Sequence, residues 1–240
     1  MNADLQDIWV YLSASPLLHL TLTLAAYAAG DWLYEKSGHW PICNPVLLAV
    51  LMLVGLLTIT GTDYHTYFQG AQFVHFMLGP ATVALAVPLY RQFDRVKQSA
   101  AAIVISLLIG SLTAIISAVV VAWALHAAPQ TLISLAPKSV TAPVAMGISE
   151  KLHGLPSLTA VMVIATGVLG ATIAGGVFKV ARIRDPRARG FALGLTSHGI
   201  GTARAFQMNE LSGAFSALAM GLNALATALL LPLLYHWFAG

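Results

Sequence analysis

Long runs of apolar residues, separated by short polar or basic stretches, are the main pattern along this 240-residue chain. The runs are continuous and do not alternate with polar residues, so the pattern predicts membrane-spanning helices and not the strands of a β-barrel. Helices also let every backbone group in lipid bond within its own segment. The hydrophobic segments lie at roughly 16–34, 43–61, 71–90, 99–126, 131–148, 156–180, 190–207 and 211–239.

Two kinds of hydrophobic segment can be distinguished. Three are long and nearly free of charge, as spanning helices are: 99–126, 156–180 and 211–239. Three others are short and rich in Gly, Pro, Ser or Thr: 71–90, 131–148 and 190–207. Irregular backbone at membrane depth is tolerated only where it is buried in protein or lines a cavity. We therefore expect the short segments to be broken or re-entrant helices that line a site.

Two clusters of basic residues indicate the orientation, because such clusters favour the cytoplasmic side. They consist of Arg91, Arg95 and Lys97, and of Lys179, Arg182, Arg184, Arg187 and Arg189. The segments 99–126 and 156–180 then cross in opposite directions, and the stretch between them starts and ends outside. One crossing needs about 20 residues of helix, so we expect 131–148 to form a re-entrant hairpin. Whether 71–90 and 190–207 cross or re-enter stays open, as does the side of the N-terminus.

A weak internal repeat is also present. The sequence 79–83 resembles 136–140, which lies 57 positions later, and the long helices that follow both matches run in opposite directions. Many secondary transporters contain inverted repeats of this kind, although a chance match in an apolar sequence is the alternative. The predicted fold is an all-α polytopic membrane protein, a transporter-like inverted-repeat bundle with broken or re-entrant helices. We place an N-terminal segment with a first membrane helix at 1–40 and the repeats at about 41–126 and 127–240.

Composition supports a membrane protein and excludes several other classes. Hydrophobic residues make up 58% of the chain and charged residues 9%, against about 25% charged in soluble domains. The basic residues lie beside hydrophobic segments, which argues against nucleic-acid binding despite a pI near 9.1. The acidic start has no basic region, so no signal peptide is expected. Cys43 is the one cysteine, so neither an internal disulfide nor a cysteine metal site is expected.

Two basic residues, Lys138 and Arg204, lie inside short segments rather than in loops. An ionisable group at membrane depth costs about 2.5–3.5 kcal/mol by insertion scales, which makes it a functional candidate. Neighbouring Pro and Gly residues interrupt the helices, and hydroxyl groups supply donors, so the pattern predicts a site for a small anion such as a carboxylate. The candidate residues are Pro137, Lys138, Ser139, Thr141, Pro143, Ser197, His198, Gly199, Gly201, Thr202 and Arg204.

Structural roles are the alternatives at each of these positions. Lys138 could extend to the membrane interface from a hairpin tip. Arg204 could pair with Glu210, and His198 could be a hydrogen-bonded structural histidine. The sequence contains no catalytic Ser/His/Asp spacing, no zinc motif and no nucleotide-binding glycine loop. We therefore expect neither an enzyme nor a cofactor, although a coupling proton or cation stays open, with His198 as the best proton candidate.

Three long stretches closely resemble one known family. They are LAPKSVTAPVAMGISEKLHGLPSLTAV at 135–161, RDPRARGFALGLTSHGIGTARAF at 184–206 and ELSGAFSALAMGLN at 210–223. All three are similar to the LrgB/CidB family, as are GPATVALAVPLYRQF and NPVLL further upstream, the latter adding Asn44 to the candidate site. Ala142 stands where the family usually has threonine, and Thr196 where it has alanine, so a ligand role for position 142 is excluded here.

This resemblance implies a multi-pass protein of the bacterial inner membrane. Family members are described as holin-like or antiholin-like modulators of murein hydrolase activity and usually have an LrgA/CidA-type membrane partner. Plastid members resemble a glycolate/glycerate translocator, and some bacterial ones are linked to pyruvate or acetate uptake. We therefore expect a homodimeric transporter of small monocarboxylates that works by alternating access. The alternatives are a holin-like or antiholin-like regulator of autolysis and a purely structural scaffold.

Overall fold

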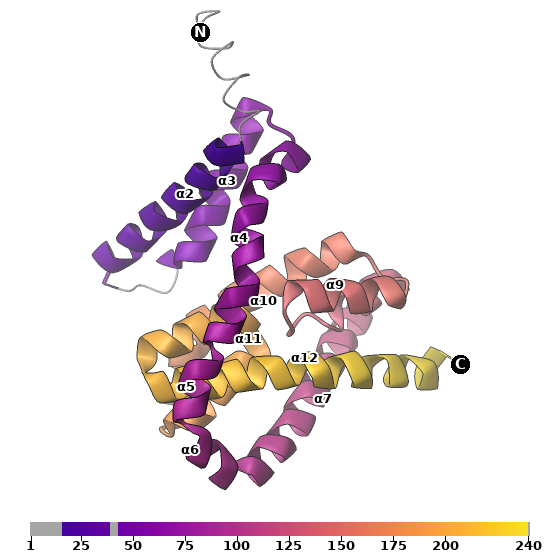
Figure 1. Cartoon of the computed structure of the whole chain (residues 1–240). Helices are drawn as coiled ribbons and strands as arrows, with labels where there is room; N and C mark the ends of the chain where they lie inside the picture. Colours follow the sequence, from indigo (N-terminus) through magenta and orange to yellow (C-terminus); the bar gives the residue numbers. More distant parts are fainter. Residues whose placement is uncertain (1–15, 39–42, 240) are drawn as a thin grey trace, which may run out of the picture. The chain divides into compact units, whose positions relative to one another are not determined.

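The computed structural model describes residues 16–38 and 43–239, most of which are helical, with no strand among them. They belong to two compact units, Met1–Ala84 and Leu85–Gly240, called here the first and second unit. The helices of the first unit are α2 (Pro16–Lys36), α3 (Pro45–Thr60) and α4 (Tyr64–Ala84). Those of the second unit are α5 (Ala86–Arg91), α6 (Phe93–Gln98), α7 (Ala100–Ala124), α8 (Pro129–Leu135), α9 (Ala142–Lys151), α10 (Pro156–Val180), α11 (Pro186–Met208) and α12 (Glu210–Ala239) (Figure 1).

In the first unit, α2 packs against both α3 and α4. His19 is buried, with its ring edge-on to Tyr67 at 5.7 Å between centroids, and Thr23 Oγ1 lies 2.9 Å from the Tyr67 hydroxyl. Gly30 lets α2 approach α3, because a Cβ there would lie 2.7 Å from the carbonyl oxygen of Pro45. These contacts hold the three helices together as one unit.

The start of α4 differs from the sequence prediction, which placed a hydrophobic segment at 71–90. The helix begins at Tyr64, before the predicted start at residue 71, and so includes the polar residues that precede the apolar segment. Asp63 Oδ2 accepts a hydrogen bond from the backbone N–H of His65 at 2.9 Å, which satisfies one of the donors left free in a first helical turn. A capped polar turn therefore precedes the apolar part of the helix.

Three of the described helices are long and apolar enough to cross a membrane: α7, α10 and residues Glu210–His236 of α12. The first two have 25 residues each, about 38 Å of helix, and many of their large apolar side chains are exposed. The chain is therefore a helical membrane protein, as predicted. The helix α2 is not among the three, so its assignment as a first membrane helix stays a prediction.

The long helices of the second unit share a common end. Arg187 Nη1 donates to Ser99 Oγ at 3.3 Å, which brings the start of α11 to the start of α7. Ser212 Oγ donates to the carbonyl oxygen of Pro186 at 2.8 Å, and Arg91 pairs with Glu210 at 3.8 Å. We call this the basic end, because residues 91–97 and 179–189 lie at it. The helices α7 and α12 start there and α10 ends there, so both basic clusters lie at one end, as predicted.

Between α7 and α10, the chain forms the predicted re-entrant hairpin. The helices α8 and α9 have only seven and ten residues, about 10 and 15 Å, and the six residues between them are not α-helical. The ends of α8 and α9 meet the start of α10, where Thr159 Oγ1 forms hydrogen bonds with the carbonyl oxygen of Ser134 at 3.0 Å and with Ser149 Oγ at 2.8 Å. Because α7 ends and α10 starts at the end opposite the basic end, the hairpin enters and leaves at that opposite end.

The helix α11 forms a second hairpin, which the sequence left undecided. His198 has φ 41° and ψ −128°, which ends one half-helix and starts another. In the first half, Gly190 and Gly194 pack on the backbone of Ser212 and Ser216, so this half is parallel to α12. In the second half, the contacts are Thr202 to Ser216 and Phe206 to Gly213, which is antiparallel. The segment 190–207 therefore re-enters from the basic end.

The two hairpins thus enter the second unit from opposite ends. This arrangement agrees with the prediction of broken or re-entrant helices at 131–148 and 190–207, whereas whether 71–90 crosses or re-enters stays open. The offset of 57 residues joins different local structures, since Gly79 and Pro80 lie within α4 whereas 136–141 separates two helices. The repeat boundaries drawn from that offset stay a prediction.

Candidate functional site

A cavity of about 1070 Å³ runs through the second unit from the basic end to the hairpin tips. Its walls come from α7, α10, α11, the tip between α8 and α9, and Phe215 of α12. From the basic end inward, the lining changes from polar to apolar and then to polar again. These three parts are called the mouth, the collar and the deep part.

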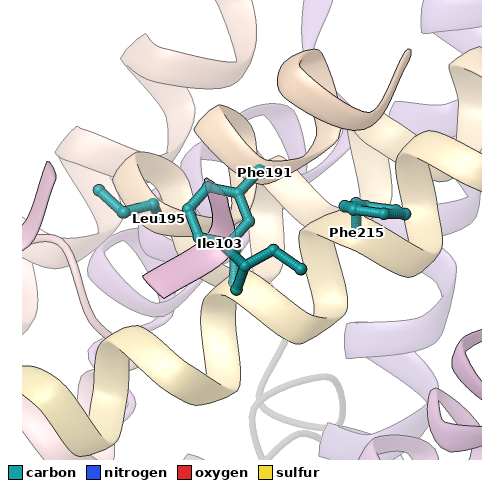
Figure 2. Packing of buried hydrophobic residues seen from close by; sticks show 5 residues of the cluster. Ile103, Phe191, Leu195 and Phe215 are labelled. Carbon is teal, nitrogen blue, oxygen red and sulfur yellow. The ribbon is translucent and has the colours of Figure 1, made fainter. Parts of the chain in front are cut away.

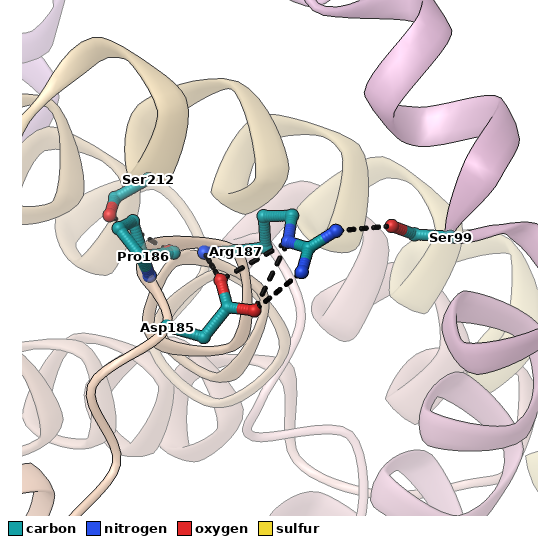
Figure 3. A network of polar contacts seen from close by, with 5 residues as sticks. All are labelled: Ser99, Asp185, Pro186, Arg187 and Ser212. Carbon is teal, nitrogen blue, oxygen red and sulfur yellow. Dashed lines mark hydrogen bonds and ion pairs between the residues drawn. The ribbon is translucent and has the colours of Figure 1, made fainter.

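The mouth is formed by Gln98, Ser99, Asp185 and Arg187. Asp185 caps α11 by accepting from the backbone N–H of Arg187 at 2.8 Å, and it holds the Arg187 guanidinium at 2.7 Å (Figure 3). This Arg187 hydrogen bond, followed by backbone donors and the cationic charge, keeps the pKa of the Asp185 carboxyl below its usual value. The guanidinium therefore stays extended beside Ser99 at the entrance.

The collar consists of Ile103, Phe191, Leu195 and Phe215, which are all buried in one hydrophobic cluster (Figure 2) that also includes Ala219. They come from three helices, α7, α11 and α12, and all four line the cavity. These apolar side chains form part of one wall of the cavity, which also carries polar groups such as Ser106 of α7. The collar therefore offers apolar contact to a solute that passes along this wall.

The deep part contains Lys138 and several hydroxyl groups. Lys138 Nζ donates to Ser139 Oγ at 3.4 Å. The two ion pairs among the described residues join Arg91 to Glu210 and Arg187 to Asp185, so neither neutralises this lysine. Besides Ser139, the lining of the same cavity carries the hydroxyl groups of Thr113, Ser117, Thr166, Thr196 and Ser197. One positive charge thus faces a cavity whose deep lining carries no carboxylate.

The tip of α11 is seated on α10. His198 Nε2 lies 3.0 Å from the carbonyl oxygen of Val163, and the side chain is 6% exposed. Gly167 and Gly170 provide the space, because a Cβ at either position would collide with His198 or with Ser197 Oγ. His198 is not a lining residue of the cavity, so its contacts match the structural alternative considered for it.

Arg204 lies on the returning half of α11 and does not line the cavity. Its Nη1 donates to Gln207 Oε1 at 3.1 Å, whereas Glu210 pairs with Arg91. The cavity therefore does not bring Arg204 to Lys138, and the ion pairs found among the described residues do not join Arg204 to Glu210.

The other predicted residues shape the backbone around the site. Pro137 and Pro143 flank the hairpin tip, and Thr141 precedes α9 as its N-cap residue. Gly201 and Thr202 pack within α11 and against α12. A Cβ added at Gly199 would have no neighbouring atom within 4 Å. Asn44 belongs to the first unit, where its Oδ1 caps α3 by accepting from the backbone N–H of Val46 and of Leu47. Of the predicted residues, Lys138, Ser139 and Ser197 line the cavity.

Several lining residues were missed, although the sequence carried a signal for some of them. Ser99, Ser106 and Thr113 recur every seven residues on α7 and all line the cavity, as residues on one helical face do. Asn223, which does not line the cavity, was also missed by the sequence prediction. It is 1% exposed, and a lone amide in a spanning helix is a candidate for interhelical hydrogen bonding.

Comparison with known proteins assigns the family. Residues 23–237 match the LrgB-like family. The chain belongs to this family. The match includes both hairpins and every residue of the cavity, so the LrgB-like architecture described above contains the whole candidate site.

Relatives of this LrgB-like chain align over nearly their full length. It is 38% identical to the uncharacterized protein YwbG of Bacillus subtilis, over 91% of this chain and 96% of that one. It is 31% identical to the holin-like protein CidB of Staphylococcus aureus, over 92% and 96%. It is 28% identical to the antiholin-like protein LrgB of Bacillus subtilis, over 94% and 98%. No solved structure gives a significant match.

Proposed function

We propose that this protein is a secondary transporter of small monocarboxylates such as glycolate, glycerate or pyruvate. The observation that supports this most directly is Lys138, which faces the cavity at the tip of a re-entrant hairpin and has no carboxylate partner among the described residues. A charge at membrane depth is costly and usually functional. A ligand carboxylate would compensate it, and hairpins from opposite ends suit alternating access.

The number of charges favours a monovalent anion. Lys138 is the one cation among the lining residues of the deep part, so a second carboxylate there would have no cationic partner in the lining. Ser139 and Ser197 offer hydroxyl donors to the carboxylate or to a substrate hydroxyl group. The collar offers apolar contact to the rest of the substrate. No group of acidic or histidine ligands for a metal ion is found in the described residues.

Uptake of labelled glycolate and pyruvate by purified protein in proteoliposomes tests this proposal. We expect saturable uptake, an increase in KM of roughly tenfold or more for Lys138→Ala, and a smaller change for Lys138→Arg, because an ion-pair contact of about 1.5–3 kcal/mol is lost or kept. Lys151→Ala is the matched control, since Lys151 is exposed in the last turn of α9. Equal uptake by wild type, Lys138→Ala and Lys151→Ala would disprove the role of Lys138.

A holin-like or antiholin-like function is the second candidate, and the names of two relatives favour it. In that case the protein would permeabilise the inner membrane, or regulate an LrgA/CidA-type partner that does, and so modulate murein hydrolase activity. Release of unrelated dyes of similar size from vesicles, without saturation by carboxylates, would support this function over transport. Both functions place a multi-pass protein, expected as a homodimer, in the inner membrane.

A further inference from the structure

We infer that Asn223 is the positioning residue that ties the tips of the two hairpins together and so sets the shape of the deep part of the cavity. Asn223 lies in the middle of α12 and is 1% exposed. It does not line the cavity, so it acts through the residues that do. The inference rests on the proposed function only where transport is measured.

The amide of Asn223 contacts both hairpins at once. Its Nδ2 donates to the carbonyl oxygen of Leu195 in α11 at 2.9 Å and to that of Ser139 in the α8–α9 tip at 3.3 Å. Leu195 and Ser139 both line the cavity, from opposite hairpins. One side chain on a continuous helix therefore connects the two cavity walls that enter from opposite ends.

Both carbonyl groups lie beside a break in a helix. Leu195 is in the last turn before His198, and the last four carbonyls of a helix have no intrahelical donor. Ser139 lies in the non-helical stretch between α8 and α9. A buried carbonyl without a donor is costly, so Asn223 stabilises the two breaks that create the cavity.

The orientation of the amide is fixed by its surroundings. Asn223 Oδ1 accepts from Ser111 Oγ at 2.7 Å and from Thr227 Oγ1 at 3.4 Å. A flipped amide would point its oxygen at two carbonyl oxygens, which can only accept. Ser111 of α7 therefore holds the amide in the orientation that binds both tips, and α7 is joined to the same network.

The test compares Asn223→Leu, which keeps the approximate volume but has no donor, with Ser216→Ala. Ser216 is the matched control, because it lies on the same helix and bonds Thr202 of α11 without a bond to the α8–α9 tip. Ser111→Ala is a milder second variant, since it removes only the bond that orients the amide. We expect KM for glycolate uptake to rise about tenfold for Asn223→Leu and less for Ser111→Ala, with Ser216→Ala near wild type.

A second readout does not depend on transport. In a Cys43→Ser background, Thr196→Cys reports on the wall next to Leu195, and Ser117→Cys reports on the α7 wall; both native side chains are exposed in the cavity. Adding Asn223→Leu should raise the rate of thiol labelling at position 196 several-fold and leave position 117 unchanged. Labelling at 196 and KM that both match those of Ser216→Ala would overturn the inference. If wild type shows no saturable uptake but the labelling differs as expected, the proposed transport fails and the positioning role of Asn223 stands.

Discussion

The polar side chains of the second unit differ in their partners according to how far they lie from the mouth of the cavity. Asp185 and Arg187 bind each other at the mouth, Lys138 faces the cavity among hydroxyl groups, and Asn223 is enclosed behind the cavity walls. An exposed pair contributes little to stability, whereas buried groups are costly to leave without a partner. Substitutions at the mouth should therefore lower the stability of the protein only modestly, and substitutions in the deep part should affect function most strongly.

Replacing Asp185 with alanine removes the N-cap of α11 and the partner of Arg187. We expect a loss of about 1 kcal/mol in the free energy of unfolding, which is typical of a lost cap. The pKa of Asp185 is lowered in the folded protein, so its contribution is present above the usual carboxyl pKa and lost as the pH falls through the lowered value. Thermal unfolding in detergent at neutral and acidic pH measures this, and a difference between variant and wild type that grows on acidification would contradict it.

Lys138 could be identified from the sequence because a lysine in an apolar, proline-interrupted segment has a high cost that needs a reason. Arg204 satisfied the same criterion, yet the cavity does not include it. The difference lies in the reversal at His198, which puts Arg204 on the returning half of the hairpin. Sequence spacing alone does not show which residues of a reversed helix face inward. It also does not show which backbone carbonyls Asn223 bonds, because they lie far from it in the sequence.

At the level of elements, the two hairpins differ in how far the sequence predicts them. The α8–α9 hairpin follows from two long helices of opposite direction with too few residues between them for a crossing. The helix α11 has 23 residues, enough for a crossing, and reverses at a single residue. Only its packing on α12 and α10 distinguishes a hairpin from a span. Packing between segments that are separated in the chain leaves no local pattern in the sequence.

The seat of the α11 tip on α10 gives a prediction for glycine replacements. Gly170→Ala should weaken packing of the tip, because the added methyl group would collide with Ser197 Oγ. We expect a destabilisation of about 1–3 kcal/mol, as in other overpacked sites, together with reduced uptake. Gly176→Ala on the same helix is the control, since a Cβ there meets nothing within 4 Å. Thermal stability and initial uptake rates compare the two, and similar behaviour would argue against a seated tip.

For the whole molecule, the contacts of the second unit make its topology testable. Both basic clusters lie at one end and the base of the α8–α9 hairpin lies at the other. In a Cys43→Ser background, Asp94→Cys and Arg184→Cys should react with a membrane-impermeant thiol reagent from the cytoplasmic side, and His153→Cys from the outer side. Vesicles of known orientation provide the measurement. Labelling of positions 94 and 184 from opposite sides would contradict the arrangement.

The depth of the cavity has an electrical consequence. Its lining reaches from Arg187 at the basic end to Lys138 at the hairpin tips, so water inside it carries the potential of that side far into the membrane. The voltage then falls over the short thickness beyond the tips and not over the whole hydrocarbon core of about 30 Å. A charge that crosses this thin barrier moves through most of the membrane potential, at about 2.3 kcal/mol per 100 mV. Passage of a lone carboxylate would therefore depend on voltage, and a co-transported proton would cancel that dependence.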